Sequence, residues 1–157
     1  MAQQFLLTMK LKTQGAIKGS SKGSSGKTQG PLDYSKGMQC HGFSYQVKSQ
    51  YDAGSGQLTG RRQHNPIRIV KEVDSASPLL WQALCSNEGF TTATLQFAKP
   101  SPSGKPAVKY TIELTDGLIS EITRARDASG KPCEHVSLTF EKMTVNGLPH
   151  GIVPYLG

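Results

Sequence analysis

Cysteine and histidine are the residue types in this chain that most readily bind a metal ion. The chain has three cysteines and four histidines, but adjacent Cys40 and His41 would point to opposite faces of a strand. No other spacing places two ligands on one turn or one helix. We therefore expect neither a metal site nor a cofactor. The residues considered are Cys40, Cys85, Cys133, His41, His64, His135 and His150.

The cysteines also show no pattern of redox or nucleophilic chemistry. Their number is odd and no C-x-x-C spacing occurs, which argues against a disulfide framework and favours reduced thiols. Cys85 falls within a predicted helix, where we expect a small buried hydrophobic residue. The cysteines therefore indicate synthesis in a reducing compartment.

One segment is similar to the end of a phosphate-binding loop. Gly26-Lys27-Thr28 matches the close of that motif, but the required glycine at position 21 is replaced by Ser21. Gly30-Pro31 would also break the helix that must follow such a loop. The sequence therefore does not predict nucleotide hydrolysis.

The acidic and serine residues give no catalytic constellation either. Glu72 and Asp74 would share a strand face, and Glu113 and Asp116 would flank a turn. Solvated strand edges account for both pairs, and no serine stands in a G-x-S-x-G turn. We therefore predict that the protein is not an enzyme.

The charge of the chain favours an anionic partner of some kind. Its formal net charge is +7 and its pI is about 9.4, so a nucleic acid or another polyanion must be considered. The basic residues are scattered, however, and Phe43 and Tyr45 alternate with Ser44 and Gln46 rather than with cations. A basic β-barrel that binds single-stranded nucleic acid or a polyanion stays the alternative function, although an acidic protein partner fits the charge equally well.

The elements that must position these residues are mostly strands. Short segments with apolar residues at alternate positions, separated by glycine and proline, are typical of antiparallel β-structure. Asp116-Gly117 predicts a hairpin turn. We expect a mainly β fold, a small antiparallel β-barrel of about seven or more strands with one flanking short α-helix and an extended loop. The predicted strands are 5–11, 38–47, 67–73, 92–98, 108–114, 118–126 and 136–145. In the second of them, Phe43, Tyr45 and Val47 would form one half-buried face.

One helix is predicted, over 78–87. Ser77 is the expected N-cap and Pro78 the first helical residue, because proline has no backbone N–H to leave unpaired there. Gly89 is the expected C-terminal cap. Leu80, Ala83 and Leu84 would face the core.

Two segments are predicted as loops within one domain that spans 1–157. Residues 15–30 are rich in Gly, Ser and Lys, a composition typical of a flexible surface loop. Residues 50–66 form a longer connection than usual, and long loops in compact domains are often functional. The N-terminus has no signal-peptide pattern, and no apolar run approaches the ~18 residues of a membrane span.

The segment from Thr59 to Leu84 resembles the haemolysin-coregulated protein (Hcp) family of type VI secretion. It carries a G-R-x-x-H-x-P piece, a strand of I-x-K-x-x-D type, then S-P-x-L and a short helix. TIELTDGLISEITRA and HVSLTFEKMTV are similar to the closing strands of that family. The resemblance covers about residues 38–146, and a related tube such as that of a phage tail shares the architecture. Residues 12–36 depart from the family pattern, being longer and richer in Lys, Gly and Ser.

The resemblance implies a structural rather than catalytic role. It implies a homo-hexameric ring, rings stacked into a tube, sheath and spike proteins as partners, and effector cargo in the lumen. It also implies export from the bacterial cytoplasm without a cleaved signal peptide, no membrane insertion, and nucleic acid as an improbable partner. The loop at 50–66 would help rings to stack. Its expected stacking residues are Gly54, Gly56, Leu58, Thr59, Gly60, Arg61, Arg62 and His64.

Overall fold

The structure is a computed structural model that describes residues 5–19, 37–49, 53–57, 63–100, 106–148 and 151–156. Strands dominate these ranges. They are β1 (Phe5–Leu11), β2 (Gly15–Ile17), β3 (Met38–Ser44), β4 (Val47–Lys48), β5 (Gln63–His64), β6 (Ile67–Glu72), β7 (Phe90–Pro100), β8 (Pro106–Arg126), β9 (Pro132–Leu148) and β10 (Gly151–Leu156). The helix α1 spans Ser77–Ser86.

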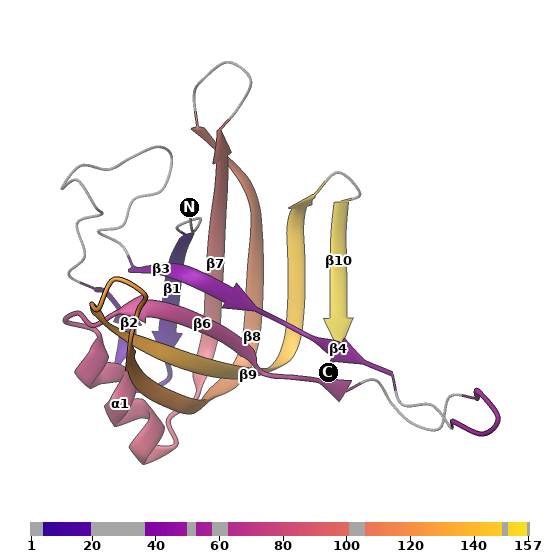
Figure 1. Ribbon diagram of the computed structural model, residues 1–157, viewed down its shortest axis with the longest axis horizontal. Coiled ribbons are helices and arrows are strands. Elements are labelled where there is room, and N and C mark those ends of the chain that lie inside the picture. Colours follow the sequence, from indigo (N-terminus) through magenta and orange to yellow (C-terminus); the bar gives the residue numbers. More distant parts are fainter. Residues whose placement is uncertain are drawn as a thin grey trace.

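Six of the strands close into a barrel (Figure 1). They run in the order β9-β6-β3-β1-β7-β8, and β8 pairs again with β9, so the sheet returns to its own start. All of these pairings are antiparallel. β10 adds to β9, and β2 adds to β1. The predicted class, a small antiparallel β-barrel with one short helix at its side, is confirmed.

The barrel interior follows from the alternation of side chains along each strand. Phe5, Leu7 and Met9 of β1 are buried, and they face buried residues of β7 such as Leu95 and Phe97. The Phe5 and Phe97 rings stack with centroids 4.8 Å apart. Residues two apart in a strand share a face. The burial of Phe5, Leu7 and Met9 therefore matches the alternation of apolar residues seen in the sequence. The core strands are therefore among the elements that the sequence predicts best.

Helix α1 packs its apolar stripe against the barrel, but its caps differ from those predicted. Ala76 holds the N-cap position without a side-chain cap, and Ser77 is the first helical residue. The Ser77 hydroxyl instead accepts a hydrogen bond from the Asp74 N–H at 3.0 Å. At the other end the left-handed residue is Asn87 (φ 56°), so the predicted Gly89 cap is also wrong. Asn87 can take this role because asparagine tolerates the left-handed region better than most residues.

The predicted hairpin at Asp116-Gly117 is wrong, because β8 continues through it. Thr115 and Gly117 pair with β7 on one side and with β9 on the other. Asp116 takes a left-handed conformation (φ 51°) within the strand. A Cβ at Gly117 would collide with the carbonyl oxygen of Thr139 and the ring of Phe90. The glycine therefore serves close strand approach rather than a turn.

Two further predictions need correction. Gly15–Ile17 belong to a strand with Ile17 buried, so the flexible loop does not begin at residue 15. Phe43 and Val47 are exposed rather than half-buried, with exposed fractions of 37% and 36%. The cause is that the register shifts after Cys40 and β4 leaves the barrel to pair with β5. Within the described residues, no helix is long and apolar enough to cross a membrane.

Candidate assembly site

A two-stranded ribbon projects from the barrel. β4 and β5 form a sheet of their own, with Val47 opposite His64 and Lys48 opposite Gln63. In Figure 1 this pair extends away from the barrel at the lower right. The segment between the two strands, predicted from sequence to be an extended loop, is therefore attached to the barrel through paired strands.

An aromatic cluster fixes the base of the ribbon. The Tyr45 hydroxyl and His64 Nδ1 are 2.6 Å apart, and their rings are nearly parallel at 16°. Phe140 of β9 packs against both, with centroid distances of 6.1 Å to Tyr45 and 5.9 Å to His64. Tyr45 lies in the connection between β3 and β4, His64 in β5 and Phe140 in β9, so the cluster ties the base of the ribbon to the barrel.

A second pair of hydrogen bonds closes the ribbon beside this cluster. The Asn65 side chain donates to Gln46 Oε1 at 2.7 Å, and the Asn65 N–H donates to the Gln46 carbonyl at 3.0 Å. Next to it lies an open hollow of about 460 Å³, lined by Ser44, Asn65, Arg68 and Glu121 among others. Most of its lining residues are polar and it is open to solvent, unlike the enclosed apolar pockets of small-molecule sites.

The structure places three of the eight predicted stacking residues. His64 is in the ribbon base, and Gly54 and Gly56 belong to the part beyond it, with Gly56 at a positive φ of 71°. An added Cβ at Gly56 would meet nothing within 4 Å, so glycine is favoured there by its positive φ and not by lack of space. Leu58, Thr59, Gly60, Arg61 and Arg62 lie outside the described residues.

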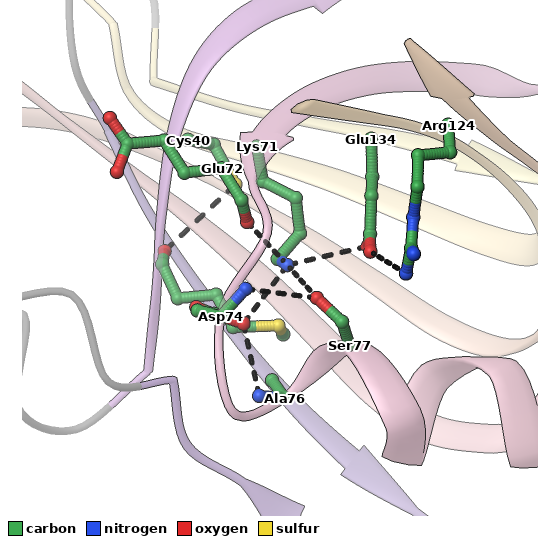
Figure 2. A network of polar contacts seen from close by, with 9 residues as sticks. Cys40, Lys71, Glu72, Asp74, Ala76, Ser77, Arg124 and Glu134 are labelled. Carbon is green, nitrogen blue, oxygen red and sulfur yellow. Dashed lines mark hydrogen bonds and ion pairs between the residues drawn. The ribbon is translucent and has the colours of Figure 1, made fainter. Parts of the chain in front are cut away.

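A buried ion network lies on the helix side of the barrel, and sequence reasoning missed it. Lys71 of β6 is fully buried, and its ammonium donates to the Glu72 carbonyl at 2.8 Å and to Ser77 Oγ at 3.3 Å. It forms ion pairs with Asp74 Oδ1 at 3.0 Å and Glu134 Oε2 at 3.5 Å. Figure 2 shows these groups converging between β6, β9 and the start of α1.

Asp74 connects this network to the helix. Its Oδ1 accepts a hydrogen bond from the Ala76 N–H at 2.9 Å, next to the first turn of α1. The Asp74 side chain is only 3% exposed, so the prediction of a solvated strand edge is wrong for this residue. The I-x-K-x-x-D pattern contained Lys71 and Asp74 three positions apart, but it gave no indication of burial. The network therefore ties the start of α1 to β6 and β9, with each buried carboxylate paired with a cation.

The three cysteines are free thiols in different surroundings. Cys40 is buried near the ion network, and burial raises the pKa of its thiol far above the ordinary value, with Lys71 opposing and Asp74 adding to the shift. Burial also raises the pKa of Cys133, aided by the carboxylates of Asp127 and Glu134. Cys85 is exposed, so the prediction that it is buried is wrong. Among the described residues, no group of three His, Cys, Asp or Glu side chains could hold a metal ion.

Comparison with known sequences identifies the class of protein. Residues 9–146 match the family described as "Type VI secretion system effector, Hcp". The match covers most of the chain, including the barrel strands β3, β6, β7 and β8 and the ion network. The chain belongs to the Hcp family of type VI secretion.

Individual relatives agree with this. The chain is 35% identical over 114 residues to the "Major exported protein" of Pseudomonas aeruginosa, an alignment that covers 68% of this chain and 66% of that one, just under two thirds of its length. A solved structure described as an Hcp protein has a TM-score of 0.87 at 22% identity, covering 99% of this chain and 100% of its own. The secreted protein Hcp3 of Pseudomonas aeruginosa has a TM-score of 0.78 at 25% identity, covering 99% and 98%.

Proposed function

We propose that this protein is the tube subunit of a type VI secretion system. Six copies form a ring, and rings stack into a tube that is exported. The observation that carries this proposal is the closed barrel with a projecting ribbon fixed at its base, in a chain of the Hcp family.

The architecture suits repeated association between copies. A closed barrel leaves few unpaired strand edges, which limits uncontrolled aggregation. One surface can then meet a different surface of the next copy, and such head-to-tail contacts close into a ring when the rotation permits. A ribbon that stands clear of the barrel reaches across to a neighbouring ring. The Tyr45–His64–Phe140 cluster supports this role, because a fixed base costs less entropy on binding than a free loop does.

The same proposal includes the partners and the route. The sheath surrounds the tube, the spike caps it, and effector proteins are carried or stabilised in the lumen. The protein is made in the bacterial cytoplasm and exported without cleavage of its N-terminus. Intact-mass measurement of protein collected from the medium tests this point. The mass should equal that of the whole 16.9 kDa chain, apart from removal of the first methionine. Loss of an N-terminal segment would contradict uncleaved export.

The stacking role of the loop is tested by charge reversal. Arg61 and Arg62 are expected to reach carboxylates of the next ring, since arginine makes strong bidentate contacts with carboxylate. The variant Arg61→Glu/Arg62→Glu should form rings of normal mass that no longer stack, as seen by negative-stain microscopy. A matched reversal of two exposed cations outside the ribbon, Lys131→Glu/Lys142→Glu, should leave stacking intact. Normal tubes from the arginine variant would contradict a stacking role for Arg61 and Arg62.

A further inference from the structure

The outer face of α1 has the composition of a contact surface. The helix contains no charged residue, although it lies at the surface of the molecule. Pro78, Trp81 and Cys85 are exposed at a spacing of three to four residues, so they form one stripe. Trp81 is the only tryptophan in the chain and is 36% exposed. Exposed tryptophan is enriched in the residues that dominate binding energy at protein interfaces.

A cation stands beside this tryptophan in a fixed position. The guanidinium carbon of Arg124 lies 5.7 Å from the centroid of the Trp81 ring. Arg124 Nη2 also pairs with the buried Glu134 at 3.4 Å, while the Arg124 side chain stays 57% exposed. Because guanidinium has five N–H donors, donors remain for a further carboxylate. We call Trp81 and Arg124 together the Trp81–Arg124 knob.

A hollow of complementary character lies on β8 and β9, where β8 runs through Asp116 and Gly117. It has a volume of about 380 Å³, and its lining includes Leu118 and Phe140. Leu118 is 45% exposed, the highest value among the large hydrophobic residues that the structure describes. Asp116 and Glu141 add two carboxylates, and Lys12 offsets one of them, which leaves a net negative hollow. We call this the Leu118 hollow.

The knob and the hollow cannot meet within one chain. Arg124 and Leu118 are six residues apart on β8, a separation of about 20 Å along an extended strand. The knob offers an aromatic ring and a cation, and the hollow offers apolar surface and net negative charge. Two different, complementary surfaces on one chain are what a head-to-tail contact requires.

We propose that the Trp81–Arg124 knob of one copy docks into the Leu118 hollow of a second copy. Trp81 covers Leu118, and the free donors of Arg124 bind the carboxylates of Asp116 and Glu141. This inference rests on the proposed function, since it names a surface through which copies assemble.

The single tryptophan makes the proposal directly measurable. Acrylamide quenching of Trp81 fluorescence is recorded for the purified chain at concentrations below and above assembly, with native mass measured on the same samples. Docking should lower the quenching constant at least about threefold in the assembled protein. Rings in which Trp81 is quenched as readily as in the monomer would overturn the knob while leaving the tube proposal intact. A protein that never assembles would overturn both.

Substitutions on each surface test the two sides of the contact. Trp81→Ala should weaken assembly about thirtyfold, the effect of losing a dominant interface residue. Asp116→Asn/Glu141→Gln should weaken assembly about tenfold, because it removes both carboxylates that bind Arg124. The fold should be kept, since asparagine tolerates the left-handed conformation at 116. Glu113→Gln, an exposed carboxylate on β8 outside the hollow, is the control and should have no effect. Unfolding midpoints identify variants that fail to fold. Equal effects of the hollow variant and the control would contradict the proposal.

Discussion

Lys71 shows how much of the site depends on contacts that one sequence does not reveal. Its partner Asp74 is close in the chain, but Glu134 comes from β9, far along the sequence. A lysine between Val70 and Glu72 on a predicted strand is ordinarily solvated, so its burial could not be derived from local pattern. The same holds for Cys85, whose exposure depends on which helix face the barrel covers. Single residues were therefore predicted least well where distant strands decide their surroundings.

Removing the Lys71 charge should destabilise the fold. Lys71→Met leaves the buried carboxylates of Asp74 and Glu134 without their shared cation, which costs about 3–5 kcal/mol. Urea denaturation measures the change. Arg124→Met, which removes a half-exposed cation from the same network, should cost less than about 1 kcal/mol. A loss for Lys71→Met no larger than that of Arg124→Met would contradict the anchoring role.

Asp127 should give a pH dependence of definite sign. Hydrogen bonds from the Ser129 side chain, and from the Lys131 and Ser129 N–H groups, lower the pKa of this carboxyl below its ordinary value of 3.8. A lowered pKa in the folded state adds stability at pH values above the unfolded pKa, and this is lost as pH falls through the folded pKa. The stability difference between the wild type and Asp127→Asn should therefore shrink below pH ~4. A carboxyl titration by NMR with a midpoint above 3.8 would contradict this.

At the scale of elements, the sequence predicted the barrel strands and the helix, but not the helix caps or where each strand ends. Alternation located β1, β6 and β7 because one face of each strand fills the barrel. The hairpin predicted at Asp116-Gly117 was wrong because this dipeptide occurs both in hairpin turns and in distorted strands. Only the pairing with neighbouring strands decides between the two. The second ribbon strand, β5, fell within the loop predicted at 50–66, since a strand of two residues carries no periodicity.

Gly117 gives the sharpest test of this reading of β8. Gly117→Ala places a methyl group against the Thr139 carbonyl and the Phe90 ring, so strands β8 and β9 must move apart. The expected cost is about 1–3 kcal/mol. Asp116→Asn is the matched control and should stay within about 0.5 kcal/mol, because it keeps both size and left-handed tolerance. Thermal unfolding separates the two, and equal midpoints would show that the strands do not approach so closely.

At the scale of the whole molecule, a closed barrel is combined with a ribbon that projects from it. The barrel joins β8 to β9 and encloses the hydrophobic core, while the ribbon and the exposed stripe of α1 stay outside it. The tube proposal gives each of these outer parts a role in contact between copies. The resemblance over Thr59–Leu84 identified the family from sequence, whereas the Trp81–Arg124 knob and the Leu118 hollow required the fold.

The most direct test of the central proposal is the native mass of the purified protein, with negative-stain images of the same sample. We predict a mass six times that of the 16.9 kDa chain, and rings with a central hole that stack at higher concentration. A strictly monomeric particle across a wide concentration range would contradict the tube proposal. It would then bring forward the binding of a polyanion, which salt-dependent binding to an oligonucleotide would reveal.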